Sequence, residues 1–145
     1  MSTNKKIWTL IFTSSEAAIN LYSILLVFQQ TKGSGIINRE DVKRITQWLR
    51  NIRRQISNID KLSNDTHGPF RQRDMSPIIA SLELDSRERS LMIYICKIIY
   101  EQLATPKGRL DWIKNQGQAD YDFAVENYKT WLTVLENENA YQDSK

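Results

Sequence analysis

Apolar residues recur at intervals of three and four along most of this chain, the spacing that places side chains on one face of an α-helix. The clearest repeat comprises Val42, Ile45, Trp48, Leu49, Ile52, Ile56 and Ile59. Five glycines and three prolines in 145 residues argue against a loop-rich or all-β design. The sequence therefore predicts an all-α fold, a single compact bundle of about six helices over residues 1–145, with two of the helices in its centre.

Helix-starting and helix-ending residues flank these apolar stretches. Thr13-Ser14-Ser15-Glu16 has the form of a capping box, with Thr13 as the capping residue. Six helices are predicted: Ser14 to about Gln30, Arg39 to about Lys61 after Asn38, Ser76-Pro77 to about Leu84, Asp85 to Ala104, Pro106 to about Gln116 closed by Gly117, and Asp120 to about Asn137.

Two of these predicted helices are apolar around more than half of their circumference. The stretch from Ala17 to Phe28 contains no charged residue, and the helix that ends at Ala104 has one narrow polar side. A helix that is apolar all round is buried, so we expect both to be the central helices.

Two segments lack a helical pattern. Residues 61–76 are polar and contain the turn-forming residues Asn, Asp, Gly and Pro, so we expect a mobile polar loop there. Residues 138–145 are predicted to form a disordered acidic tail.

The chain has few groups that could carry out chemistry. His67 is its one histidine and lies in the polar loop, while Cys96 is its one cysteine and lies on the core side of a helix. One histidine and one cysteine do not make a zinc site or a disulfide. Asp120 and Asp122 could hold a hard cation, but acids at a helix N-terminus, with Asp120 as the cap, are the simpler interpretation. We therefore expect a non-enzymatic protein with no catalytic residue, cofactor or metal.

The charged residues are distributed unevenly along the chain. The net charge is +3, yet residues 39–73 contain nine basic and four acidic residues, and residues 120–145 contain two basic and six acidic residues. At about 100° per residue, five basic side chains of the helix after Asn38 fall within roughly 60° of each other, opposite the apolar stripe. They are Arg39, Lys43, Arg50, Arg54 and Lys61.

This basic face predicts a surface that follows the phosphate backbone of a nucleic acid, with RNA favoured. No helix-turn-helix, RNP or zinc-finger motif is present, so we expect no base-specific reading. The candidate nucleic-acid-binding residues are Arg39, Lys43, Arg50, Arg53, Arg54, Lys61, Arg71 and Arg73.

The same features allow a different class of function, a structural or adaptor subunit. The basic face could bind an acidic protein surface, and exposed apolar residues could form a homo-oligomer interface. The candidates are the first apolar helix, Trp8, Phe123 and Val134. Isoleucine outnumbers leucine by 17 to 13, a bias associated with AT-rich genomes such as those of many viruses and phages.

The N-terminal apolar run is too short to direct the chain to a membrane. It ends after six residues, Ile7 to Phe12, whereas a secretory signal needs at least about seven. The next run, Ile19 to Phe28, has about half the length that a bilayer crossing requires. We expect an intracellular, cytoplasmic protein without a membrane partner.

Overall fold

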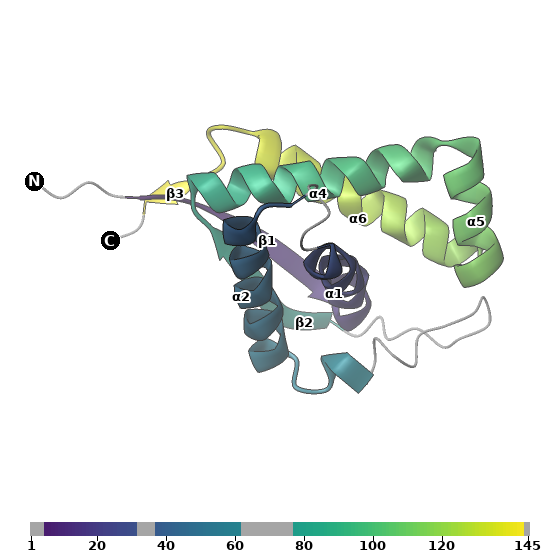
Figure 1. Ribbon diagram of the computed structural model, residues 1–145, viewed down its shortest axis with the longest axis horizontal. Coiled ribbons are helices and arrows are strands. Elements are labelled where there is room, and N and C mark those ends of the chain that lie inside the picture. The colour runs from purple at the N-terminus through teal and green to yellow at the C-terminus, as the bar shows by residue number, and fades with distance from the viewer. Residues whose placement is uncertain (1–4, 32–36, 62–76, 144–145) are drawn as a thin grey trace, which may run out of the picture. The chain divides into compact units, whose positions relative to one another are not determined.

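The computed structural model describes residues 5–31, 37–61 and 77–143. The elements follow the order β1 (Lys6–Ser14), α1 (Ser15–Gln30), α2 (Arg39–Gln55), β2 (Pro77–Leu84), α4 (Ser86–Ala104), α5 (Pro106–Gln116), α6 (Gln118–Glu136) and β3 (Gln142–Asp143) (Figure 1). The chain forms two compact units. We call residues 12–31, 37–61 and 77–82 the α1–α2 unit, and residues 5–11 and 83–143 the α4–α6 unit.

The all-α prediction was wrong, because the fold is mixed. Most residues are helical, but three strands form an antiparallel sheet in the order β2-β1-β3. Ile7 pairs with Gln142 and Lys6 with Asp143 in the short β1–β3 ladder. The helix expected from Ser76-Pro77 to Leu84 is the strand β2.

Both long strands bury every second residue, as a strand with one covered face does. In β1, Trp8, Leu10 and Phe12 are buried, whereas Ile11 is 60% exposed. In β2 the buried residues are Ala80, Leu82 and Leu84. An exposed apolar residue on the open face of each strand, Ile11 in β1 and Ile79 in β2, interrupts the alternation and makes the period of two hard to recognise in the sequence.

Most helices start at or next to the residue that the sequence predicts. The Asn38 side chain accepts a hydrogen bond from the Asp41 amide at 2.8 Å, and Asp85 and Glu88 form a complete capping box at the start of α4. Helix α1 differs by one residue, since Ser14 instead of Thr13 caps it by accepting the Ala17 amide hydrogen bond.

Two helices end or begin at other positions than predicted. Helix α2 ends at Gln55, since Ile56 is extended, and does not continue to Lys61. Helix α6 begins after Gly117, so Asp120 is not its cap. Gly117 has φ 94°, which favours glycine, and its N–H bonds to the carbonyl of Ile113, which closes α5.

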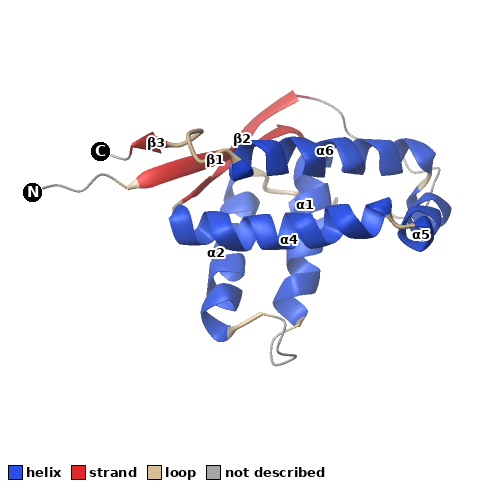
Figure 2. Cartoon of the chain, turned by 90° about the horizontal axis from the view of Figure 1, so that it is seen from above, coloured by secondary structure: helices blue, strands red, loops and turns tan. Residues whose placement is uncertain are grey.

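In the α1–α2 unit, the two helices pack side by side (Figures 1 and 2). Residues Ile45, Trp48, Leu49 and Ile52 form the buried side of α2. A polar contact joins the helices as well, because the Gln29 amide donates to the Thr46 hydroxyl at 2.9 Å. The predicted apolar stripe of α2 is therefore its packing side.

In the α4–α6 unit, α4 and α6 run alongside each other and α5 packs on both of them at one end (Figure 2). The Trp131 indole donates to the Ile11 carbonyl at 3.1 Å, and the Trp8 indole donates to the Asn137 carbonyl at 3.0 Å. The two indoles therefore link β1 to α6 and to Asn137, the residue that follows it.

The C-terminal segment is held by contacts between aromatic rings and cationic groups. The Arg89 guanidinium lies 4.5 Å from the Trp8 ring centre, Trp8 lies 5.5 Å from Tyr141, and the Lys6 ammonium lies 4.7 Å from Tyr141. Cations over aromatic rings contribute about 0.5 to 2 kcal/mol each. The predicted acidic tail, residues 138–145, thus includes β3 and the contact of Tyr141 with Trp8.

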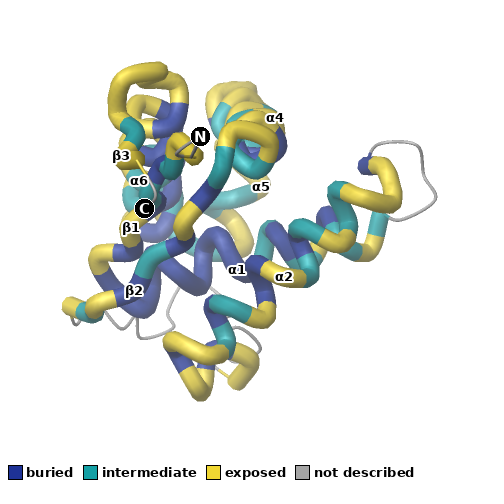
Figure 3. The backbone as a smooth tube through the Cα atoms, turned by 90° about the vertical axis from the view of Figure 1, so that its left-hand side faces the viewer, coloured by how far each residue is buried: buried dark blue, intermediate teal, exposed yellow. Residues whose placement is uncertain are grey.

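Burial differs between the two helices expected in the centre (Figure 3). Residues Ser15 to Tyr22 of α1 are all buried, but Val27 is 56% exposed. Helix α4 buries five residues, while Tyr94 is 45% exposed. Helix α4 was expected to be a central helix with one narrow polar side, and it buries fewer of its residues than such a helix would.

The predicted mobile loop lies almost entirely outside the described residues, which omit 62–76. In the described part of the chain, no helix combines the length and the apolar character needed to cross a lipid bilayer.

Replacement of the α4 cap tests the account of its start. Asp85→Ala removes the acceptor for the Arg87 and Glu88 amides, so the free energy of unfolding should fall by about 1 kcal/mol. Urea unfolding followed by circular dichroism measures this change. Ser86→Ala, one residue later, should change stability by less than half as much; an equal loss would contradict the capping role.

Candidate nucleic-acid interface

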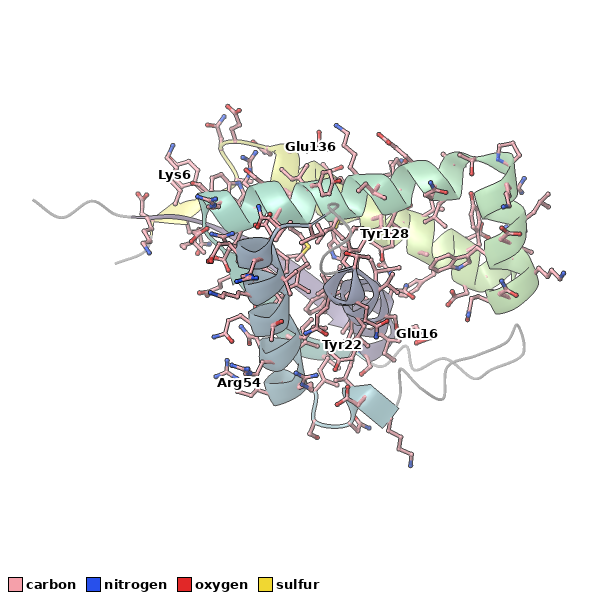
Figure 4. The ribbon with its side chains drawn as sticks, viewed as in Figure 1. Lys6, Glu16, Tyr22, Arg54, Tyr128 and Glu136 are labelled. Atoms are coloured by element: carbon pink, nitrogen blue, oxygen red, sulfur yellow. The ribbon has the colours of Figure 1, made fainter. Side chains whose placement is uncertain are left out.

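The side of α2 opposite its buried stripe carries exposed basic residues. Arg39, Lys43, Arg50 and Arg54 are all exposed, and Figure 4 shows Arg54 on the side of α2 that points away from α1. The rise of 1.5 Å per residue places Arg39 and Arg54 about 22 Å apart along the helix. This basic face of α2, defined by these four residues, is the central part of the predicted site.

Nearby acids neutralise little of this basic face. Lys43 lies 3.4 Å from Glu40, and both side chains are more than 60% exposed, so this pair contributes little. Arg39, Arg50 and Arg54 form no ion pair with any residue that the structure describes. The Arg50 guanidinium instead donates to the neutral Gln47 amide oxygen at 3.1 Å, which leaves its charge available.

Arg44 is the basic residue of α2 whose charge is most fully paired. Its guanidinium lies 2.6 Å from the Asp41 carboxylate, and both side chains are less than a quarter exposed. Glu40 and Arg44 are four positions apart, a spacing that allows an ion pair on a helix, but the structure pairs each acid with the basic residue three positions later. Either pairing removes Arg44 from the basic face.

Arg53 has an internal role that the sequence did not reveal. Its guanidinium donates to the Tyr22 hydroxyl at 3.0 Å, and the same hydroxyl donates a hydrogen bond to the Asp60 carboxylate. Tyr22 comes from α1 and is fully buried. The three side chains join α1, α2 and the segment after α2, so Arg53 belongs to this polar network and not to the basic face.

The polar network favours the protonated phenol of Tyr22. Burial raises the pKa of Tyr22 above 10.0, and the hydrogen bond to Asp60 raises it further, while Arg53 acts in the opposite direction. The hydroxyl therefore remains a donor to Asp60 at neutral pH.

The remaining predicted residues lie off the helix. Lys61 is exposed, but it follows the end of α2 at Gln55 and is not part of the helical face. Arg71 and Arg73 lie outside the described residues. The structure thus brings together four of the eight predicted side chains on one helix surface.

The alternative interface residues have different environments. Trp8 is 3% exposed and packs within the α4–α6 unit, so its side chain offers little surface to a partner. Val134 is 36% exposed and Phe123 is half-buried.

The carboxylate of Asp120 and the thiol of Cys96 are buried in the packed interior of the α4–α6 unit. Asp120 is 3% exposed and accepts a hydrogen bond from the Trp112 indole at 2.9 Å. Burial raises the pKa of the Cys96 thiol to about 12 and raises that of Tyr128 well above 10.0. No group of three or more metal-binding side chains occurs among the residues that the structure describes.

An open groove in the same unit, with a volume of about 390 Å³, differs from the basic face in its charge. Its charged lining residues are two lysines and two glutamates, namely Lys97, Lys129, Glu101 and Glu136. Opposite charges at equal number give no preference for a polyanion. The groove is therefore the weaker candidate for binding a nucleic acid.

Comparison with known proteins finds no match to a family model, a curated protein or a solved structure. The functional argument therefore rests on the residues of this chain.

Removal of the Tyr22 hydroxyl tests the polar network. Tyr22→Phe should lower the free energy of unfolding at pH 7 by about 1 to 2 kcal/mol, because Arg53 and Asp60 each lose a buried partner. Because the pKa of Tyr22 is higher in the folded than in the unfolded protein, the protonated phenol stabilises the folded state below pH 10. This stabilisation is lost as the pH rises through the raised pKa. The difference between the two proteins in urea unfolding should therefore shrink above about pH 10.

Tyr94→Phe is the matched control, because Tyr94 is 45% exposed. It should leave stability within about 0.5 kcal/mol of the wild type. Equal stability of Tyr22→Phe and the wild type would contradict the network.

The reactivity of Cys96 tests its burial. With a pKa of about 12, roughly one thiol in ten thousand is ionised at pH 8, and the side chain is fully buried. Iodoacetamide should therefore label Cys96 at least a hundred times more slowly in the folded protein than in guanidinium chloride. Rapid labelling of the folded protein, measured by mass spectrometry, would contradict an inert thiol.

Proposed function

We propose that this protein binds the phosphate backbone of a nucleic acid through the basic face of α2, without base-specific reading and without catalysis. The observation that carries the proposal is the concentration of exposed arginine and lysine on one side of a helix whose other side is buried. Phosphate contacts supply affinity independently of sequence, and arginine suits them because its guanidinium can bind two phosphate oxygens.

The length of the basic face is compatible with a short stretch of nucleic acid. About 22 Å separates Arg39 from Arg54 along the helix, and one strand of a duplex rises about 3.4 Å per nucleotide. The face therefore spans roughly six nucleotides. Its side chains are exposed and lie in water before binding, so contact with phosphates requires no opening of the core.

Four phosphate contacts make a definite prediction for salt dependence. The logarithm of the binding constant should fall by about 3.6 for each tenfold rise in salt on duplex nucleic acid, and by less on single strands. Affinity should drop roughly 100-fold between 50 and 200 mM salt. A titration with single-stranded and double-stranded RNA and DNA, followed by fluorescence anisotropy, measures this slope and tests the expected preference for RNA.

Charge reversal locates the binding surface. Arg50→Glu/Arg54→Glu should reduce affinity at 100 mM salt at least 100-fold while the circular dichroism spectrum stays unchanged, because both residues are exposed. Lys107→Glu/Lys114→Glu on α5 is the matched control, since it makes the same change in net charge at exposed positions of the other unit. The control should lose less than tenfold.

Two results would contradict the proposal. Undiminished binding by Arg50→Glu/Arg54→Glu would show that the basic face of α2 is not the binding site. Absence of binding to all four nucleic acids at 50 mM salt would remove the function, and would favour an acidic protein surface as the ligand of the basic face.

A further inference from the structure

The side chain of the last residue of α2 bonds to the backbone of the strand β2. The carboxamide of Gln55 accepts a hydrogen bond from the Ser81 backbone N–H at 2.9 Å and donates one to the Ser81 carbonyl at 2.7 Å. Both backbone groups of one strand residue are thus satisfied by one side chain. In an antiparallel ladder, a residue of the adjacent strand offers the same pair of groups, one acceptor and one donor.

The carboxamide is held in this orientation by a third hydrogen bond. Its nitrogen also donates to the Asn51 side-chain oxygen at 3.0 Å, one turn earlier on α2. An amide nitrogen has two hydrogens, and here one bonds to Ser81 and the other to Asn51. Asn51 therefore keeps the carbonyl oxygen of Gln55 turned toward the N–H of Ser81.

Ser81 lies on the free edge of the sheet among the described strands. The sheet order is β2-β1-β3, so β2 is an outer strand. Residues two apart in a strand direct their N–H and C=O groups to the same side, which places those of Ile79 on the same edge as those of Ser81. The Ile79 side chain is fully exposed. Such an edge can pair with a further strand unless something blocks it.

We propose that the Gln55 side chain occupies a strand-pairing site on β2, and that the strand it excludes is β2 of a second copy of this chain. Two copies of β2 can pair antiparallel about a two-fold axis beside Ala80. Ile79 of each copy then exchanges both hydrogen bonds with Ser81 of the other copy.

The same register brings the two exposed isoleucines together. Residues diagonal to each other across an antiparallel pair lie about 7 to 8 Å apart, and in this pairing they are the two copies of Ile79. Each would lose contact with water on the open side of the strand. The edge is therefore complementary to itself in both its backbone groups and its apolar side chain, which is why a second copy is the proposed occupant.

Removal of the Gln55 side-chain amide tests the proposal. Gln55→Ala leaves the backbone groups of Ser81 open to another strand, and alanine suits an exposed helix position. Sedimentation equilibrium over a concentration series should give a dimer dissociation constant at least tenfold lower than that of the wild type. Gln47→Ala, the same change at another exposed position of α2, should behave as the wild type. An unchanged mass for Gln55→Ala would overturn the proposal.

A second variant identifies the route of association. Gln55→Ala/Ile79→Lys places a charge on the proposed pairing strand, at a position whose side chain is fully exposed. It should return the dissociation constant to the wild-type value. A dimer that persists in this double variant would overturn the proposal, because the contact would then lie elsewhere. Circular dichroism and thermal unfolding of each variant check that association does not arise from unfolding.

Discussion

The packing of α2 on α1 decides which side of α2 meets water, and the candidate site depends on it. Four buried apolar side chains fix the rotation of α2 about its axis, and the Gln29–Thr46 hydrogen bond and the Tyr22 network fix its position along α1. Burial of each large apolar side chain contributes about 1.5 to 3 kcal/mol, far more than the repulsion between neighbouring arginines on the opposite side. The fold can therefore hold uncompensated positive charges together on one surface.

The basic residues of α2 have two different roles that depend on their angle around the helix. Arg53 lies about 40° beyond the arc of the basic face, on the side of α1, and reaches Tyr22. Arg50 and Arg54 project into water. Gln55 at the end of the same helix bonds to the backbone of β2, so one helix contributes an exposed basic surface, a part-buried polar network with Tyr22, and a side chain that covers the edge of β2.

Features that depend on residues close together in the sequence could be predicted, whereas contacts between residues far apart in the sequence could not. The caps at Asn38 and Asp85 depend on residues three positions away, and both were found. The strand β1 pairs with residues near the C-terminus, and apolar residues such as Ile11 on its open face obscured its alternation. The partner of Arg53, Tyr22, lies 31 residues away, and the second partner of the Tyr22 hydroxyl, Asp60, lies beyond the end of α2, so no spacing rule indicates either contact. The exposed cations of α2 were predictable because they depend on the helix period alone.

The central claim is that the basic face of α2 is the surface that contacts nucleic acid. A titration of the ¹⁵N-labelled protein with a short RNA oligonucleotide, followed by NMR, tests it most directly, because each backbone amide reports on its own surroundings. The account predicts that the largest chemical-shift changes fall within Arg39–Gln55, with small changes in Pro106–Gln116 of α5. The largest changes in α5 or in the groove beside Lys97, or no change at millimolar RNA, would contradict it.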